Sequence, residues 1–395
     1  MSTLPEEVQA GVPESPRVPA TADRARAALA ARWELDLRGG FLPLDTPETL
    51  PGSAFAGWEA LMKKLPEIGA DREEIFRAVA AQSENAESVE VFLRCCERRF
   101  LIRAHVVFGF IVHVIVNGPS KEPWEASDEI PVELAEPFMI VNERLGLPGI
   151  CCSCTYDTFK WKLRDPSGPV CLDNLETSAS MSGETAEEAF HLTAAMHGDM
   201  ADAMFDLLQA PEHVRDGDME ALKSTLRKVR GGLLNCIKIF KVMVERLEPD
   251  SFEAYRPYMQ GFNPNGVVFA RREGPPSVVV AKGASAGQTA MFFLIDAALD
   301  VHHVKSAGAF ANEMLDYIPS KHRECVIDFR ERLNACGSLR EIEAIHKEYK
   351  SAINALHAFR AFHQRVVLAF LSKVAYGTGA SDFRVLLQEA LDQTK

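Results

Sequence analysis

The 395-residue chain has no excess of positive charge: 43 lysines and arginines stand against 56 aspartates and glutamates, which gives a net charge of −13. A protein this acidic is repelled by phosphate backbones and by anionic lipid surfaces. We therefore expect neither nucleic acid nor a membrane as the main partner. A local basic pocket that binds one small carboxylate is still compatible with this charge balance.

Long hydrophobic runs and a secretion signal are also missing. The longest apolar run, residues 106–116, is shorter than the roughly 20 residues that cross a bilayer, and it contains His113. The run therefore predicts a buried helix. The first thirty residues are rich in proline, alanine and charge and lack the apolar centre of a signal peptide. These absences predict a cytoplasmic protein.

The cysteines do not form the even, regularly spaced set of a disulfide framework. There are nine of them, and several are adjacent, such as Cys95 and Cys96. This usage predicts reduced thiols. Cys151, Cys152 and Cys154 are spaced too tightly for a zinc site of the C-x2-C type, and no second pair of ligands follows nearby. We expect no metal there.

Strand patterns are scarce, and most of the chain repeats with a helical period. Helices are predicted at residues 23–33, 58–65, 71–82, 88–116, 134–145, 185–209, 216–247, 251–259, 286–302 and 350–374, with a terminal helix after residue 382. Two β-branched runs within residues 261–283 predict one hairpin or ordered loop. The predicted fold class is all-α, with a smaller N-terminal and a large C-terminal helical domain. The predicted limits are a disordered tail at 1–30, a small domain at 31–165, a connection at 166–183 and a large domain at 184–395.

The helix predicted at residues 350–374 places one imidazole on an otherwise apolar face. Steps of three and four residues give the stripe Ile353, Leu356, Arg360, His363, Val367, Phe370 and Val374. A buried neutral imidazole is the commonest axial ligand of haem iron. The alternative is a core histidine that is hydrogen-bonded to a carbonyl. His357, on a more polar face, and His346, in a charged helix, are weaker candidates for a ligand.

A second polar group lies in the apolar helix predicted at residues 286–302. Asp296 stands between FFLI and AAL, and a carboxylate in such surroundings needs a partner. Arg360 is the best candidate. Ser285 precedes the helix, with Gln288 three residues later, which is the pattern of a capping box.

Several segments occur in an order that resembles the indoleamine 2,3-dioxygenase family over residues 35–395. They are GFLPLDTPETLP, LPG…YDTFKWKLRDP, EEAFHL, YRPYMQGFNPNG, GASAGQTAMFFLIDAALDV, IPSKHRECV, HAFRAFHQRVV and GTGASDF. The resemblance implies an all-helical haem b protein with a large haem-binding C-terminal domain. It also implies oxidation of the indole ring of tryptophan by O2 to give N-formylkynurenine, with an electron donor that keeps the haem ferrous.

The resemblance also implies roles for individual residues. His363 matches the proximal ligand of the haem iron, and Arg360 and Asp296 match the pair that supports the proximal side of the haem. Arg256 matches the arginine that binds the substrate carboxylate, and Phe252 an aromatic side chain that packs on the indole. The remaining cofactor and substrate contacts implied are Ser285, Ala286, Phe190, Ser153, Tyr156, Ala194 and Thr378, the last in a GTG loop that closes over the amino acid.

The chain departs from the family pattern at four positions. Ser153 stands where the family usually has tyrosine, and Ala194 where many members have serine. Ala380 replaces a glycine of the closing loop, and Ser251 stands where another aromatic residue is expected. A wider and more polar pocket would admit a substituted or larger indole.

Three alternatives therefore stay open. The chain could be a haem enzyme of secondary metabolism that acts on a modified tryptophan, a haem-binding protein without turnover, or a helical scaffold without a cofactor. Arg256 and the GTG loop favour an enzyme, because a haem carrier needs neither a carboxylate-binding cation nor a lid. His191 is a further candidate for the distal pocket because it follows Phe190. The GTG loop lacks the preceding strand and the lysine of a phosphate-binding loop, so no nucleotide is expected.

Overall fold

The computed structural model describes residues 22–69, 71–118, 129–371, 374, 376–379 and 382–394. The helices of its N-terminal part are α1 (Ala22–Trp33), α2 (Ala56–Ile68), α3 (Arg72–Ala80), α4 (Ala86–Cys95), α5 (Arg98–Asn117) and α6 (Val132–Leu145). Those of its C-terminal part are α7 (Thr185–Ala189), α8 (His191–Leu208), α9 (Ala210–Asp216), α10 (Met219–Arg246), α11 (Pro249–Tyr255), α12 (Ala290–Ala298), α13 (Lys305–Met314), α14 (Ser320–Cys336), α15 (His346–Phe370) and α16 (Phe383–Asp392). The predicted all-α fold class is confirmed.

Short turns and strands connect the helices. The single helical turns are η2 (Ser53–Phe55), η3 (Ser83–Asn85), η5 (Leu172–Asn174), η6 (Arg256–Met259), η7 (Leu315–Tyr317), η8 (Leu339–Glu341) and η9 (Glu343–Ile345), with a π-helical turn η4 (Thr155–Phe159). The strands are β1 (Glu129–Ile130), β2 (Trp161–Leu163), β3 (Leu175–Thr177), β4 (Val267–Phe269) and β5 (Ser277–Val279). The predicted hairpin is confirmed, because β4 pairs antiparallel with β5 and also parallel with β1. The antiparallel pair of β2 and β3 was not predicted.

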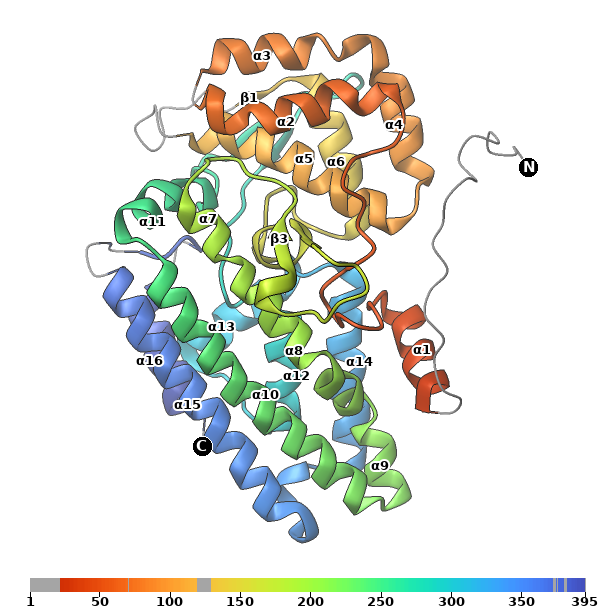
Figure 1. The fold of residues 1–395 in the computed structure, drawn as a ribbon, viewed down its shortest axis with the longest axis vertical. Helices are drawn as coiled ribbons and strands as arrows, with labels where there is room; N and C mark the ends of the chain where they lie inside the picture. The colour runs from red at the N-terminus through yellow and green to blue at the C-terminus, as the bar shows by residue number, and fades with distance from the viewer. Residues whose placement is uncertain are drawn as a thin grey trace.

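The helices form two groups that lie one above the other in Figure 1. Helices α2 to α6 make the upper group around α5, in which every side chain from Leu101 to Val116 is buried. The apolar run is therefore a buried helix, as predicted. By length and apolarity α5 could span a membrane, but 89% of its most apolar window is buried inside the protein.

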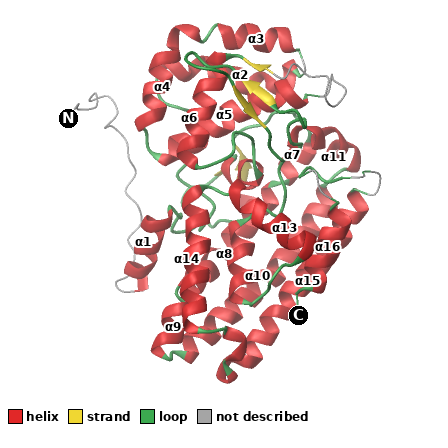
Figure 2. Ribbon diagram, turned by 180° about the vertical axis from the view of Figure 1, so that it is seen from behind, coloured by secondary structure: helices red, strands yellow, loops and turns green. Residues whose placement is uncertain are grey.

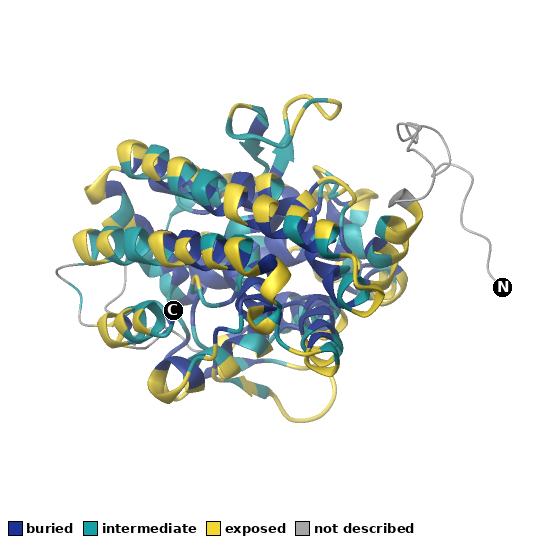
Figure 3. Ribbon diagram, turned by 90° about the horizontal axis from the view of Figure 1, so that it is seen from below, coloured by how far each residue is buried: buried dark blue, intermediate teal, exposed yellow. Residues whose placement is uncertain are grey.

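The lower group consists of long helices that run side by side, among them α8, α10, α12, α14 and α15 (Figures 1 and 2). Exposed residues follow the outer faces of the helices, and buried residues follow the inner faces (Figure 3). Helix α1 packs on α14, where Arg32 donates to Asp328 over 2.8 Å. The four predicted domain limits stay a prediction, and residues 1–21 of the expected tail lie outside the described residues.

The predicted helix at residues 88–116 is wrong in one respect, because it is two helices. The backbone is extended at Cys96 and Glu97, so α4 ends before α5 begins. Arg144 of α6 donates to the carbonyl oxygens of Leu93 (2.8 Å) and Cys96 (2.9 Å), which satisfies the end of α4. This cap comes from a residue far away in the sequence, so the local pattern could not indicate it.

The segment before α12 also differs from its prediction. Ser285 does not open the helix, which begins at Ala290. The side-chain oxygen of Gln288 still accepts the backbone N–H of Ser285 at 3.3 Å, which is the contact of a capping box, and it also accepts that of Ser153 at 2.8 Å. Gln288 thus connects the segment at Ser285 to the segment at Ser153, and the chain stays irregular between Ala284 and Thr289.

Candidate functional site

A cavity of about 420 Å³ opens among the helices of the lower group, next to η4. This volume lies within the roughly 300–1,000 Å³ of small-molecule and cofactor sites. Among the residues that line it are most of those singled out in the sequence: Ser153, Tyr156, Phe190, Phe252, Arg256, Ser285, Ala286, Asp296, Arg360, His363 and Thr378. These residues come from segments spread over more than two hundred positions of the chain, and the fold brings them to one cavity.

Ala194 is the predicted site residue that the structure does not bring to the cavity. It is fully buried in a separate cluster with Leu42 and Trp161. Thr193, its neighbour, lines the cavity instead. The predicted helix at residues 185–209 is interrupted at Phe190, where α7 ends and α8 begins, and no helix-breaking residue indicates this interruption.

His363 projects from α15 into the cavity between two aromatic rings. Its imidazole is parallel to the ring of Phe359, with centroids 6.3 Å apart and an angle of 6° between the planes, and lies 5.6 Å from the ring of Phe240. Burial, with a smaller contribution from Arg360, lowers its pKa to about 4. Within the described residues no group forms a hydrogen bond with this imidazole. It is neutral at pH 7 and free to act as a ligand, so the alternative of a carbonyl-bonded core histidine lacks its partner.

Asp296 and Arg360 form the pair that the sequence predicted. One terminal nitrogen of Arg360 lies 2.6 and 2.7 Å from the two carboxylate oxygens, and Nε2 of His303 lies 3.0 Å from one of them. Burial would raise the pKa of Asp296, but Arg360 and His303 outweigh it and hold that pKa below its ordinary value. His303 is a partner that sequence reasoning missed, since it looked like a cation at a helix end. Arg360 also donates to the hydroxyl of Thr394.

Arg256 stands in η6 with part of its hydrogen-bonding capacity unused. One terminal nitrogen donates to the carbonyl oxygen of Tyr376 at 2.7 Å, while its buried Nε has no partner among the described residues. Burial lowers the pKa of the guanidinium from its ordinary value. Thr378 of the GTG loop lies against the segment before α12. Its hydroxyl donates to the carbonyl oxygen of Ala284, and its backbone oxygen accepts the N–H of Gly283 at 3.2 Å. Ala380 lies outside the described residues.

Aromatic rings form the wall next to Arg256. Phe190 and Phe252 are nearly parallel, with centroids 6.4 Å apart, and Phe190 also meets Tyr255 at 5.8 Å. Ser251 does not face the cavity. Its hydroxyl accepts the backbone N–H of Ala186 at 2.9 Å and donates to Glu184, so it fixes the start of α7.

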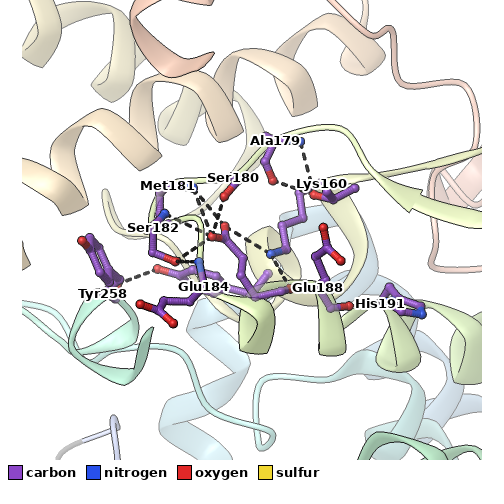
Figure 4. Close-up of polar contacts among 12 residues, drawn as sticks. Lys160, Ala179, Ser180, Met181, Ser182, Glu184, Glu188, His191 and Tyr258 are labelled. Carbon is purple, nitrogen blue, oxygen red and sulfur yellow. Dashed lines mark hydrogen bonds and ion pairs between the residues drawn. The ribbon is translucent and has the colours of Figure 1, made fainter. Parts of the chain in front are cut away.

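A buried ion pair lies next to Tyr255, whose ring centroid is 5.6 Å from Nζ of Lys160; Figure 4 shows Lys160 among its neighbours. Lys160 is fully buried and donates to the backbone oxygen of Glu187 at 3.0 Å and to its carboxylate at 3.4 Å. The same carboxylate accepts bonds from Ser180, Met181 and Ser182. His191 lies outside the cavity, with its ring 5.8 Å from that of Trp161.

A carboxylate that sequence reasoning missed also lines the cavity. Asp157 follows Ser153 by one helical turn, and the Ser153 hydroxyl donates to it. The hydroxyl of Thr193 lies 3.1 Å from its other oxygen and 2.6 Å from the carbonyl oxygen of Phe190, so two acceptors compete for its one hydrogen. Burial raises the pKa of Asp157 to about 6, although both hydroxyls and Lys160 oppose the shift. The i, i+4 spacing from Ser153 was the one signal that could have indicated this cluster.

Comparison with known proteins decides the family. The model of the indoleamine 2,3-dioxygenase family matches residues 29–380. The chain belongs to this family. It is 26% identical to indoleamine 2,3-dioxygenase 1 of Rattus norvegicus, over 97% of this chain and 98% of the relative. It is 28% identical to 6-hydroxytryptophan 2,3-dioxygenase fscD of Fusarium equiseti, over 89% and 87%, and 24% identical to myoglobin of Haliotis diversicolor, over 90% and 95%.

Family membership makes the chain a dioxygenase, and the family's cofactor is haem. The residues present fit that group. An indoleamine 2,3-dioxygenase needs an unprotonated axial imidazole in a largely apolar cavity, and His363 is neutral, unpaired and flanked by aromatic rings. Arg360 is occupied by Asp296 and Thr394, so it holds the proximal side together and is not free to pair with a haem propionate.

Proposed function

We propose that this chain binds haem b through His363 and inserts both atoms of O2 across the indole 2,3 bond of L-tryptophan or a close relative, giving N-formylkynurenine. The observation that carries the proposal is that two groups in one cavity have no hydrogen-bond partner among the described residues: the neutral imidazole of His363 and, in Arg256, the buried Nε. One fits the cofactor and the other fits an amino-acid carboxylate.

The protein's own residues bind and orient the substrate. When bound, the ferrous haem supplies the activation of O2. Arg256 pairs with the substrate carboxylate, and Phe190 and Phe252 hold the planar indole. The GTG loop, tied down through Thr378, covers the cavity and excludes water while the reaction proceeds.

The test is a spectrum of the haem-loaded protein, reduced without oxygen and then given L-tryptophan and O2. N-formylkynurenine absorbance should appear. It should be lost in His363→Ala together with the spectrum of a histidine-ligated haem, and Arg256→Ala should raise KM by roughly 10- to 100-fold, as expected for a lost charged hydrogen bond. Arg230→Ala, at an exposed position of α10, is the matched control and should behave as the parent. Failure to take up haem would overturn the proposal.

A ring-substituted tryptophan is the second candidate substrate. The Fusarium equiseti relative is named for 6-hydroxytryptophan. The polar groups Ser153, Asp157 and Thr193 along one cavity wall support a substrate with a polar ring. Turnover of hydroxylated tryptophans beside tryptophan in the same assay separates the two.

Haem binding without turnover is a third candidate, favoured by the similarity to a protein named myoglobin. Arg256 and Thr378 speak against it, because oxygen storage requires no carboxylate-binding cation next to the haem. Perturbation of the haem spectrum by added tryptophan would indicate an organised substrate site and exclude a pure carrier. The electron donor that keeps the haem ferrous and the cytoplasmic location stay predictions.

A further inference from the structure

The described part of the cavity holds a carboxylate, Asp157, that the reaction as proposed does not use. Binding of the amino-acid carboxylate needs a cation, and the haem needs an imidazole. Asp157 is neither, and yet its side chain lines the cavity with surface still open to it. Placing a carboxylate at an apolar ligand site is unfavourable unless the ligand or the protein satisfies it.

The protein holds this carboxylate in place without using all of its acceptor capacity. Ser153, in the turn before η4, donates to one oxygen, and the hydroxyl of Thr193 in α8 lies 3.1 Å from the other while it also contacts the carbonyl oxygen of Phe190. The backbone N–H of Ser153 is in turn bonded to Gln288 at 2.8 Å. An ionised carboxylate accepts about four hydrogen bonds, so two hydroxyl donors leave room for a donor from the ligand.

Asp157 lies apart from the other two functional groups of the cavity. No ion pair within 4 Å joins it to Arg256 in the described structure, and the two residues come from different elements, Asp157 from η4 and Arg256 from η6. His363 comes from a third element, α15. Besides the Asp296–Arg360 pair, the cavity thus presents three polar groups to a ligand: the imidazole, the guanidinium and the carboxylate.

These three groups fix how an indole amino acid would lie, given the function proposed above. The amino-acid carboxylate is held at Arg256, and the pyrrole ring, which reacts, must lie at the iron bound to His363. The benzo ring is then the part of the substrate that faces Asp157. In tryptophan this ring carries only C–H groups, which cannot satisfy a carboxylate.

We propose that Asp157, positioned by Ser153 and Thr193, accepts a hydrogen bond from a donor on the benzo ring, so that the site selects a ring-hydroxylated tryptophan over tryptophan itself. A site built to bind a substrate hydroxyl discriminates strongly against the analogue that lacks it, because its polar group is then left unpaired. The polar wall formed by Ser153, Asp157 and Thr193 is therefore a specificity determinant and not only a connection between η4 and α8.

The experiment compares tryptophan with tryptophans hydroxylated at each benzo position, in the haem-loaded parent, Asp157→Val and Asp157→Asn. Dissociation constants are measured from the perturbed haem spectrum, and kcat/KM from product formation. Asp199→Asn is the matched control, since it makes the same charge change on α8 at a carboxylate that is bonded to Asn235 outside the cavity. Thermal unfolding of each variant shows whether the fold is retained.

We expect the parent to favour the best hydroxylated substrate by roughly 10- to 100-fold in both quantities. Asp157→Val should abolish or reverse this preference, chiefly by weakening the binding of the hydroxylated substrate. Asp199→Asn should keep the preference. Equal losses for both substrates would overturn the inference, since Asp157 would then serve the shared indole N–H or the fold alone. An unchanged preference in Asp157→Val would overturn it too. If no indole amino acid is oxidised, the proposed function fails, and the ratio of dissociation constants still decides the role of Asp157.

Discussion

Removal of the Asp296 carboxylate should be among the most damaging single changes to this protein. Its side chain is 8% exposed and that of Arg360 14% exposed, and the two lie 2.6 Å apart. Asp296→Asn keeps the shape but leaves the guanidinium without its counter-charge. Breaking a buried pair in this way costs about 3–5 kcal/mol. We expect the lower end, about 3 kcal/mol, because Arg360 keeps its bond to Thr394.

The assay is urea unfolding of the haem-loaded protein followed by circular dichroism. With a slope of about 3 kcal/mol per M, suited to a large chain, the midpoint should fall by about 1 M. The double variant Asp296→Asn with Arg360→Met removes both charges and should recover most of this loss. Glu220→Gln, which breaks the exposed pair with Lys223, should leave the midpoint unchanged.

Two results would refute this reasoning. If the double variant loses as much free energy of unfolding as the two single variants lose together, the two ions are not coupled and the loss has another cause. The pH dependence gives a second check. Because the folded pKa of Asp296 is lowered, its stabilisation is present above the ordinary aspartate value of about 3.9 and is lost as the pH falls through the folded pKa. A pair that still stabilised the fold below both values would contradict the assignment.

Three further predictions test other parts of the structure. Burial lowers the pKa of His105 to about 3 and that of His113 to about 4. Below the ordinary value of about 6.5 the unfolded chain therefore binds protons that the folded chain does not, and the free energy of unfolding measured in urea should fall by about 1.4 kcal/mol per pH unit for each histidine. A flat profile between pH 6.5 and 4 would contradict this. Arg144→Met should lower the free energy of unfolding by about 1–3 kcal/mol by leaving two carbonyls at the end of α4 unsatisfied, whereas exposed Arg94→Met should not. The preference for a ring-hydroxylated substrate should be present above pH 6 and should decline as the pH falls through about 6, which is the pKa of Asp157. The charged and titratable neighbours of Asp157 are Lys160, Cys154 and Tyr255. A preference that is constant across this range would count against the carboxylate as the acceptor.

The sequence predicted correctly that His363, Arg360 and Asp296 lie together, for a physical reason. His363 and Arg360 are one turn apart on a single helix, so helical periodicity alone put them on one face. Asp296 stood among apolar residues and required a partner, which the structure supplies. His303 was missed because it reaches Asp296 from the irregular segment after α12, where no period relates the two positions.

Two of the predictions that failed involve contacts between distant segments. The break between α4 and α5 is stabilised by Arg144, some fifty residues later. Gln288 keeps its contact with Ser285 but also bonds Ser153, and α12 begins only at Ala290. Ala194 was assigned from the resemblance alone, and its neighbour Thr193 lines the cavity.

The two sides of the cavity therefore differ in how freely the sequence can vary. On the side of His363, the cation Arg360 and the carboxylate Asp296 must both be present, because losing one leaves the other buried and unpaired. The substrate side tolerates exchange more readily, because Ser153 and Thr193 hold Asp157 in place and leave part of its acceptor capacity to the substrate. A carboxylate can thus occupy this wall at low cost to the fold, and its effect falls on substrate choice. Family membership is accordingly a good guide to the cofactor and the reaction, while the ring substituent of the substrate has to be inferred from this wall.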